Sequence, residues 1–152
     1  MPEETTMTED RQFCTFMVDK LHFGVEVLQV QELIRFQEMT RVPLANSVIR
    51  GLINLRGQIV TAIDLRRRLG LERREDGALP MNVVIRTDEG VLSLLVDEIG
   101  DVLNVSQDSF ERPPETISGV ARELISGVYK LKDRLLLILD TEKAASFNGM
   151  AA

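Results

Sequence analysis

The stretch "GLINLRGQIVTAIDLRRRLGL", residues 51–71, contains two apolar runs, one turn and one triple arginine. The apolar runs on either side of Arg56-Gly57 have the length of short strands, and a glycine at such a junction suits a tight turn. Gly70 is expected to end the arginine run after one or two helical turns. The stretch therefore predicts a β-hairpin with Arg56 at its tip, followed by a very short helix.

The same pattern occurs a second time, 76 residues further along the chain. The segment "VIRGLINLRGQIVTAIDLRRR" aligns without a gap on "LISGVYKLKDRLLLILDTEKA". The most informative matches are Gly51/Gly127, Leu55/Leu131, Arg56/Lys132 and Asp64/Asp140. Fixed-offset similarity of this kind favours duplication of one small β unit. Units of about 70 residues bury little surface alone, so the two copies should pack together.

Other apolar runs, separated by turn residues, extend the β pattern over the rest of the chain. Hairpins are predicted around Asp19-Lys20 and Asp88-Glu89-Gly90. Residues 28–36 alternate apolar and polar side chains and fit either a strand or a short helical turn. Asn46 or Ser47 is expected to cap a very short helix that ends at Gly51. The predicted fold class is all-β with few short helices, as small barrels or a sandwich.

Composition indicates a soluble cytoplasmic protein. Hydrophobic residues make up 44% of the 152 residues, and a single cysteine suits a reducing compartment. The acidic, polar start lacks the basic and apolar regions of a signal peptide. The longest strictly apolar run, Leu135 to Leu139, is far too short for a membrane span.

Charge is distributed unevenly along the chain. The net charge is -6, yet eight arginines and only two acidic residues lie between Arg41 and Arg74. Such a basic band in an acidic protein favours partner contacts through complementary patches. The band contains no aromatic residue, so it offers no stacking platform for nucleic-acid bases. The triple arginine, Arg66, Arg67 and Arg68, is interpreted as a solvated face of the short helix.

Motifs of catalysis are missing from the sequence. It contains neither a phosphate-binding loop nor a dinucleotide fingerprint. The predicted first hairpin places Cys14 opposite Val25 and His22 opposite Met17, so a Cys–His pair would be separated by about 10 Å along the strand. Cys14 is expected to be buried and His22 half-exposed. We therefore predict that the protein is not an enzyme.

Metal binding is also not expected. One histidine and one cysteine provide no transition-metal cluster. Asp97, Glu98 and Asp101 lie close together in sequence, which allows a weak cation site or, more simply, a solvated strand end. No cofactor is predicted.

Four segments together resemble the CheW family of bacterial chemotaxis coupling proteins. They are "FGVEVLQVQELI", "PLANSVIRGLINLRGQIVTAIDLRRRLGL", "VVIRTDEGVLSLLVDEIGDVLNV" and "YKLKDRLLLILDTEK". The N-L-R-G hairpin followed by I-D-L-R is a specific signal in that context. The resemblance implies two SH3-like five-stranded β-barrel subdomains and a non-catalytic adaptor. Such an adaptor bridges the cytoplasmic tips of chemoreceptors to the histidine kinase CheA in receptor arrays.

The resemblance also implies a domain layout. Residues 1–11 are expected to be a disordered N-terminus and residues 147–152 a C-terminal tail. Residues 12–146 form the CheW-like domain, whose two intertwined barrel subdomains meet near residues 72–80. The protein is expected to be recruited to membrane-associated receptor arrays without inserting into the membrane, and to bind no nucleic acid.

Site residues follow from the resemblance position by position. The implied receptor-binding residues, some of which support the surface, are Val30, Glu32, Gly51, Asn54 and Arg56. The implied surfaces toward the regulatory domain of CheA include Leu33 and the loop from Phe110 to Ile117. At the hairpin tip, Arg56 is expected to be restrained by Glu32. Val30 would contribute to an apolar floor for a receptor helix.

Two alternative functions remain open at the level of sequence. One is a CheW-like scaffold of another chemosensory pathway, such as pilus motility or gene regulation. The other is a β module that binds a small ligand or nucleic acid through the basic band.

Overall fold

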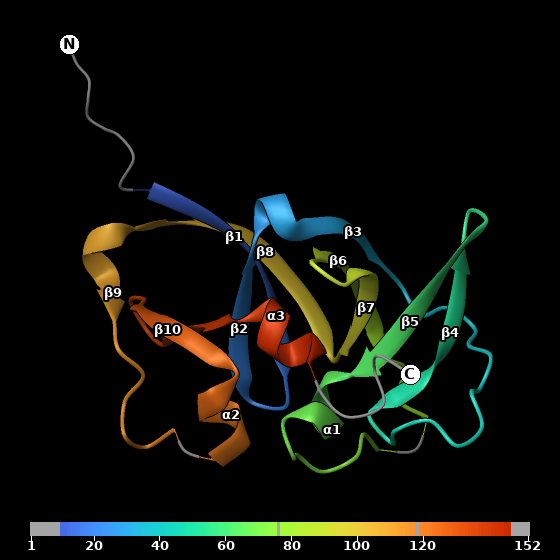
Figure 1. Ribbon diagram of the computed structural model, residues 1–152. Coiled ribbons are helices and arrows are strands. Elements are labelled where there is room, and N and C mark those ends of the chain that lie inside the picture. Colours follow the sequence, from blue (N-terminus) through green and yellow to red (C-terminus); the bar gives the residue numbers. More distant parts are fainter. Residues whose placement is uncertain (1–9, 76, 118, 147–152) are drawn as a thin grey trace.

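The structure, a computed structural model, describes residues 10–75, 77–117 and 119–146 (Figure 1). Expectations for residues 1–9 and 147–152 lie outside this part of the chain. Asp10 and Arg11, which the sequence placed in the disordered N-terminus, are the first residues of strand β1. In the described residues no helix has the length and apolarity needed to cross a bilayer.

Strands dominate the fold, as predicted. The strands are β1 (Asp10–Val18), β2 (Leu21–Glu26), β3 (Val30–Ile34), β4 (Ile49–Leu55), β5 (Gln58–Asp64), β6 (Met81–Thr87), β7 (Gly90–Val96), β8 (Glu98–Ser106), β9 (Phe110–Glu111), β10 (Ile125–Lys130) and β11 (Leu135–Leu139). The helical turns are η3 (Val27–Gln29), α1 (Leu65–Arg68), η4 (Gln107–Ser109), α2 (Gly119–Glu123) and α3 (Thr141–Ala145).

Two sheets lie side by side in Figure 1 and take strands from both repeats. One sheet has the order β8-β1-β2-β11-β10-β9, and the other has the order β3-β6-β7-β5-β4. The parallel pairs β11–β2 and β5–β7 join strands from opposite sides of the linker at residues 71–80. The linker therefore divides the two repeats in the sequence, but each sheet contains strands from both sides of it.

The two copies of the duplicated unit share an irregularity that sequence similarity alone does not require. In the β4–β5 hairpin Ile49 pairs with Ile63 and Gly51 with Ala62, so one extra residue bulges from β4. The β10–β11 hairpin has the same bulge at the aligned position. Asp64 and Asp140 each cap the helix that follows through a side-chain oxygen. These shared details support a duplicated unit.

The predicted register of the first hairpin is confirmed. Cys14 pairs with Val25 and Met17 with His22 around the Asp19-Lys20 turn. Cys14 is buried, as expected. The half-exposed position predicted for His22 is wrong, because its side chain is only 6% exposed. His22 is the second residue of β2, which lies between β1 and β11, and Asp133 and Arg134, just before β11, are close enough to act on its pKa.

The helix predicted before Gly51 is absent from the described residues. Turns occupy this segment until β4 begins at Ile49, and the Asn46 side chain accepts a hydrogen bond from the N–H of Val48 at 2.9 Å. Asparagine stabilises such turns as readily as it caps helices. Residues 28–36 contain both of the predicted alternatives, because the 3-10 turn η3 precedes strand β3.

A single main core fills the space between the sheets. Its fully buried residues include Phe16 and Phe23 from the six-stranded sheet and Val83, Ile85 and Leu94 from the five-stranded sheet. A smaller cluster that includes Ile53 and Val84 lies on the other face of the five-stranded sheet, because Val84 alternates with Val83 and Ile85 along β6. Because both clusters are apolar and tightly covered, they hold the β4–β5 hairpin in a defined position.

Candidate functional site

The tip of the β4–β5 hairpin is a strained two-residue turn. Arg56 and Gly57 have φ values of 53° and 87°, both in the left-handed region. This conformation matches the twist of a hairpin, but it costs a non-glycine residue about 1–2 kcal/mol. The Asn54 side chain accepts the N–H of Gly57 at 2.9 Å and so fixes the turn. The tip therefore presents an arginine where asparagine or glycine would be more stable.

The predicted restraint of Arg56 by Glu32 is confirmed. The Arg56 guanidinium donates to the Glu32 carboxylate at 2.5 Å, and this hydrogen bond raises the pKa of Arg56. Glu32 is 16% exposed in its side chain and Arg56 is 78% exposed. Exposed ion pairs contribute little to folding stability, so the main effect of this pair is to orient the guanidinium.

Gly51 supports the β4–β5 hairpin through a close backbone contact. A Cβ atom at this position would lie 2.7 Å from the carbonyl oxygen of Thr40. Thr40 and Leu52 exchange backbone hydrogen bonds of 2.9 and 2.8 Å, which attach the β3–β4 connection to β4. Gly51 is buried, and it acts by allowing this close approach of two backbones.

Replacing Gly51 by alanine is expected to lower the free energy of unfolding by about 2 kcal/mol, because the clash is with backbone. The aligned glycine is a matched control. A Cβ at Gly127 would meet only the ring of Phe110, a half-exposed side chain that can rotate away, so Gly127→Ala should cost less. Urea denaturation of both variants measures the difference. Equal losses would contradict the supporting role of Gly51.

Apolar groups beside Arg56 differ from those expected. Val30 is only partly exposed, because it packs against the main core. Ile59 pairs with Asn54 across the hairpin and is 60% exposed. The sequence-based site prediction does not include Ile59. Side chains alternate along a strand, and Val60 and Ala62 point into the core. This alternation predicts that Ile59 points the other way.

The three residues assigned to the kinase surface do not form one patch. Leu33 lies on β3, an edge strand of the five-stranded sheet, and Phe110 lies on β9, an edge strand of the six-stranded sheet. Phe110 is 43% exposed and contacts Tyr129 edge to face, with ring centroids 5.3 Å apart. Ile117 is partly buried against the main core.

The prediction of a solvated arginine face on α1 is wrong. Arg66 forms three hydrogen bonds with Asp97, and its side chain is only 14% exposed. Arg68 donates to carbonyl oxygens at the C-terminal end of α3, and Arg67 donates to the carbonyl of Ser47 at 3.0 Å. Helix α1 is a single turn between packed segments, so each arginine reaches a different neighbour.

Asp97 also differs from its predicted role as a solvated strand end or cation ligand. Its carboxylate accepts hydrogen bonds from Arg66, from Arg74 at 2.9 Å and from the N–H of Asp19 at 2.6 Å. Burial acts to raise the pKa of Asp97, but the hydrogen bond from Arg66, the Asp19 N–H and the two guanidinium charges outweigh it. The pKa of Asp97 therefore lies below its usual value.

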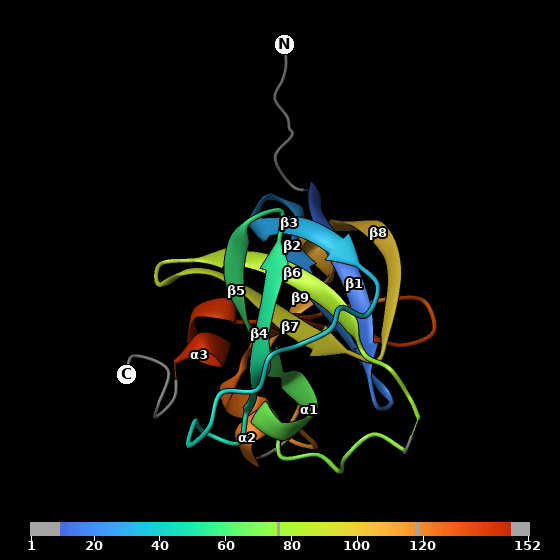
Figure 2. The same ribbon diagram turned by 90° about the vertical axis from the view of Figure 1, so that its right-hand side faces the viewer.

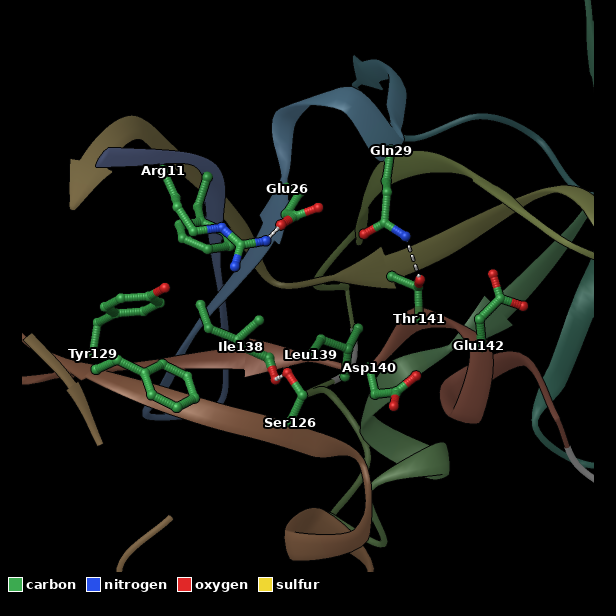
Figure 3. A pocket seen from close by; sticks show the side chains of 12 residues that line it. Arg11, Glu26, Gln29, Ser126, Tyr129, Ile138, Leu139, Asp140, Thr141 and Glu142 are labelled. Carbon is green, nitrogen blue, oxygen red and sulfur yellow. Dashed lines mark hydrogen bonds and ion pairs between the residues drawn. The ribbon is translucent and has the colours of Figure 1, made fainter. Parts of the chain in front are cut away.

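A small pocket of about 250 Å³ lies between β1, η3 and α3 (Figure 3). Arg11 and Glu26 point toward each other as an ion pair on one side, and Gln29 donates to the Thr141 hydroxyl at 3.1 Å. Asp140 caps α3. These polar groups pair with one another within the wall of the pocket and therefore form no evident catalytic set.

Reactive and metal-binding groups have an inert setting in the described residues. Burial raises the pKa of the Cys14 thiol, which disfavours the nucleophilic thiolate. Burial lowers the pKa of His22, with Arg134 acting in the same direction and Asp133 opposing it. No group of three or more His, Cys, Asp or Glu side chains in the described residues could hold a metal ion.

Comparisons with known proteins agree on one family. The family model described as "CheW-like domain" matches residues 12–147. "Chemotaxis protein CheW" of Treponema pallidum (strain Nichols) is 30% identical over 142 residues, which cover 91% of this chain and 84% of the relative. "Chemotaxis protein CheW" of Bacillus subtilis (strain 168) is 34% identical over 125 residues, which cover 82% and 80%.

A crystal structure shares the fold. The scaffolding protein TtCheW from Thermoanaerobacter tengcongensis superimposes with a TM-score of 0.82 at 24% identity. The match covers 91% of this chain and 94% of that chain.

Proposed function

The chain belongs to the CheW-like domain family, and from this we propose that it is a non-catalytic adaptor that couples chemoreceptor tips to the histidine kinase CheA in chemosensory arrays. The observation that carries the receptor side of this proposal is the Glu32–Arg56 pair at the hairpin tip. A strained turn that exposes an oriented arginine is better suited to recognition than to stability.

The receptor surface combines that oriented charge with apolar contacts. Ile59 lies exposed two residues beyond the turn, and Val30 offers part of its side chain from β3. Spaced apolar contacts and one fixed cation suit the apolar face and an acidic group of a helix. The area is small, so a single contact is weak, and arrays strengthen it because many such contacts act together.

The kinase surface is proposed to use residues other than those of the hairpin tip, although Leu33 directly follows Glu32 on β3. Leu33 and Phe110 lie on edge strands of different sheets, and Ile117 lies in the loop that follows β9. Separate surfaces would allow the adaptor to hold a receptor and the regulatory domain of CheA at the same time. The protein would act in the cytoplasm, recruited to membrane-associated arrays through the receptors.

The proposal is tested by mixing the full chain with a receptor cytoplasmic fragment and CheA. Co-sedimentation of all three proteins and a change in kinase activity are expected. If neither partner sediments with the chain and kinase activity is indifferent to it, the proposal is wrong. Labelled DNA at physiological ionic strength should remain unbound, and a salt-dependent shift would instead favour a nucleic-acid binder.

The same adaptor chemistry would also serve a chemosensory pathway other than chemotaxis. A scaffold for pilus motility or gene regulation would use the same fold and the same family motifs. Identifying which kinase is captured from the native cell distinguishes these outputs.

A further inference from the structure

A wide cleft lies away from the hairpin tip. It has a volume of about 810 Å³ and is lined by residues between 36 and 50, by residues 73–75 and 77–80, and by Asp64 and Arg67. We call it the arginine cleft. The lining takes residues from the start of β4, the end of β5 and α1. Figures 1 and 2 show these three elements. Strands of seven residues place it roughly 20 Å from Arg56.

The floor of the cleft has more positive than negative charge. The Asp64 carboxylate is buried and faces Arg50 at 3.2 Å, Arg74 at 3.5 Å and Arg67 at 3.9 Å. Arg74 also donates to Asp97 at 2.9 Å, so Asp64 is shared mainly between Arg50 and Arg67, and one carboxylate does not neutralise both guanidinium groups. Across the whole lining, five arginines stand against three carboxylates, in a protein whose net charge is -6. A concave surface of this kind concentrates the field and attracts negative charge.

The rim of the cleft exposes aliphatic side chains. Leu44 is fully exposed, and its φ of 65° places a leucine in the left-handed region. Val42, on the same loop, is 38% exposed, and Leu79, on the opposite wall, is 63% exposed. A strained loop that holds a leucine in water is costly for the free protein, and strain of this kind collects at binding surfaces. The rim therefore favours an occupant that also has apolar groups.

We propose that the arginine cleft binds an acidic segment of a partner protein in which aliphatic residues flank the carboxylates. The carboxylates would meet the arginines of the floor, and the aliphatic residues would cover Val42, Leu44 and Leu79. Glu38 and Glu75 stand among the arginines and would repel a compact polyanion such as pyrophosphate. A polypeptide can space its charges to avoid them. This site is distinct from the proposed receptor and kinase surfaces.

The test uses the full chain, isotopically labelled, and two-dimensional amide NMR spectra. The probe is the peptide ELEELLEELE, compared with the same peptide carrying serine at every leucine position and with inorganic pyrophosphate. The leucine-containing peptide should shift amide signals of the non-proline residues in 41–47 and of residues 77–79, and raising the salt concentration should weaken its binding. The serine peptide and pyrophosphate should bind at least about fivefold more weakly.

Two variants of the cleft and one control variant distinguish a loss of binding from a loss of folding. Arg41→Glu should weaken binding of the leucine-containing peptide at least about fivefold. Lys130→Glu makes the same charge change on β10 and should leave this binding unchanged. Leu44→Asn should weaken it similarly while the thermal midpoint stays equal or rises, because asparagine tolerates a left-handed backbone. Equal binding of the serine peptide or pyrophosphate, or shifts confined to the β4–β5 tip, would overturn the proposal. Unchanged affinity of the leucine-containing peptide for both Arg41→Glu and Leu44→Asn would also overturn it.

Discussion

Replacing Arg56 by aspartate is expected to weaken binding to a receptor cytoplasmic fragment at least about tenfold, or about 1.4 kcal/mol. The substitution removes the cation and places a carboxylate beside Glu32, so two like charges face the partner at the hairpin tip. The thermal midpoint should change by less than about 2 °C, since an exposed ion pair contributes little to stability. Sedimentation binding curves and circular dichroism melts measure both quantities.

The duplicated hairpin contains a matched control for this experiment. Lys132 aligns with Arg56 and is exposed in the turn between β10 and β11. Lys132→Asp makes the same charge change at the equivalent position of the other repeat, and receptor binding should be retained. Equal losses from Arg56→Asp and Lys132→Asp would show that net charge, rather than the tip of the first hairpin, governs binding. A collapsed melt for Arg56→Asp would show that the residue is structural.

Replacing Asp97 by alanine is expected to lower the free energy of unfolding by about 3 kcal/mol, because it leaves two largely buried guanidinium groups without their main carboxylate. Arg66 and Arg74 are 14% and 9% exposed in their side chains. For a chain of this size the thermal midpoint should fall by about 10 °C. Glu98→Ala changes the adjacent, exposed carboxylate and should cost less than about 0.5 kcal/mol.

The contribution of Asp97 should also depend on pH. The folded protein holds the pKa of Asp97 below its usual value, so the stabilisation is complete above the unfolded pKa, at about pH 4. It is lost as the pH falls through the lower pKa of the folded state. Urea midpoints of the wild type and Asp97→Ala should therefore differ at pH 7 and converge in acid. A difference that persists unchanged below that range would exclude the carboxylate as its source.

Local patterns in the sequence were sufficient for the hairpins. The β1–β2 register and the tip at Arg56-Gly57 depend on turn residues between apolar runs, and both are confirmed. The repeat predicted a shared unit, and the matching bulges support it. The Glu32–Arg56 contact was expected only through the family resemblance, since 24 residues separate the two in sequence.

Long-range contacts explain what the sequence did not predict. Arg68 lies 76 residues from the carbonyl of Ala144 that it contacts, and nothing near it in the sequence indicates that partner. The triple arginine therefore read as a solvated face, although its members join three segments. His22 was misplaced for a similar reason, because the burial of β2 depends on β11 at the other end of the chain.

The exchange of strands between the repeats has a consequence for synthesis and folding. Strand β11 lies inside the six-stranded sheet, between β2 and β10, although more than a hundred residues separate it from β2. During translation, nearly the whole polypeptide must leave the ribosome before β2 can pair with β11. So many distant pairings predict slow, highly cooperative folding. A nascent chain interrupted before residue 135 would leave β2 with an unpaired edge, a surface that promotes aggregation.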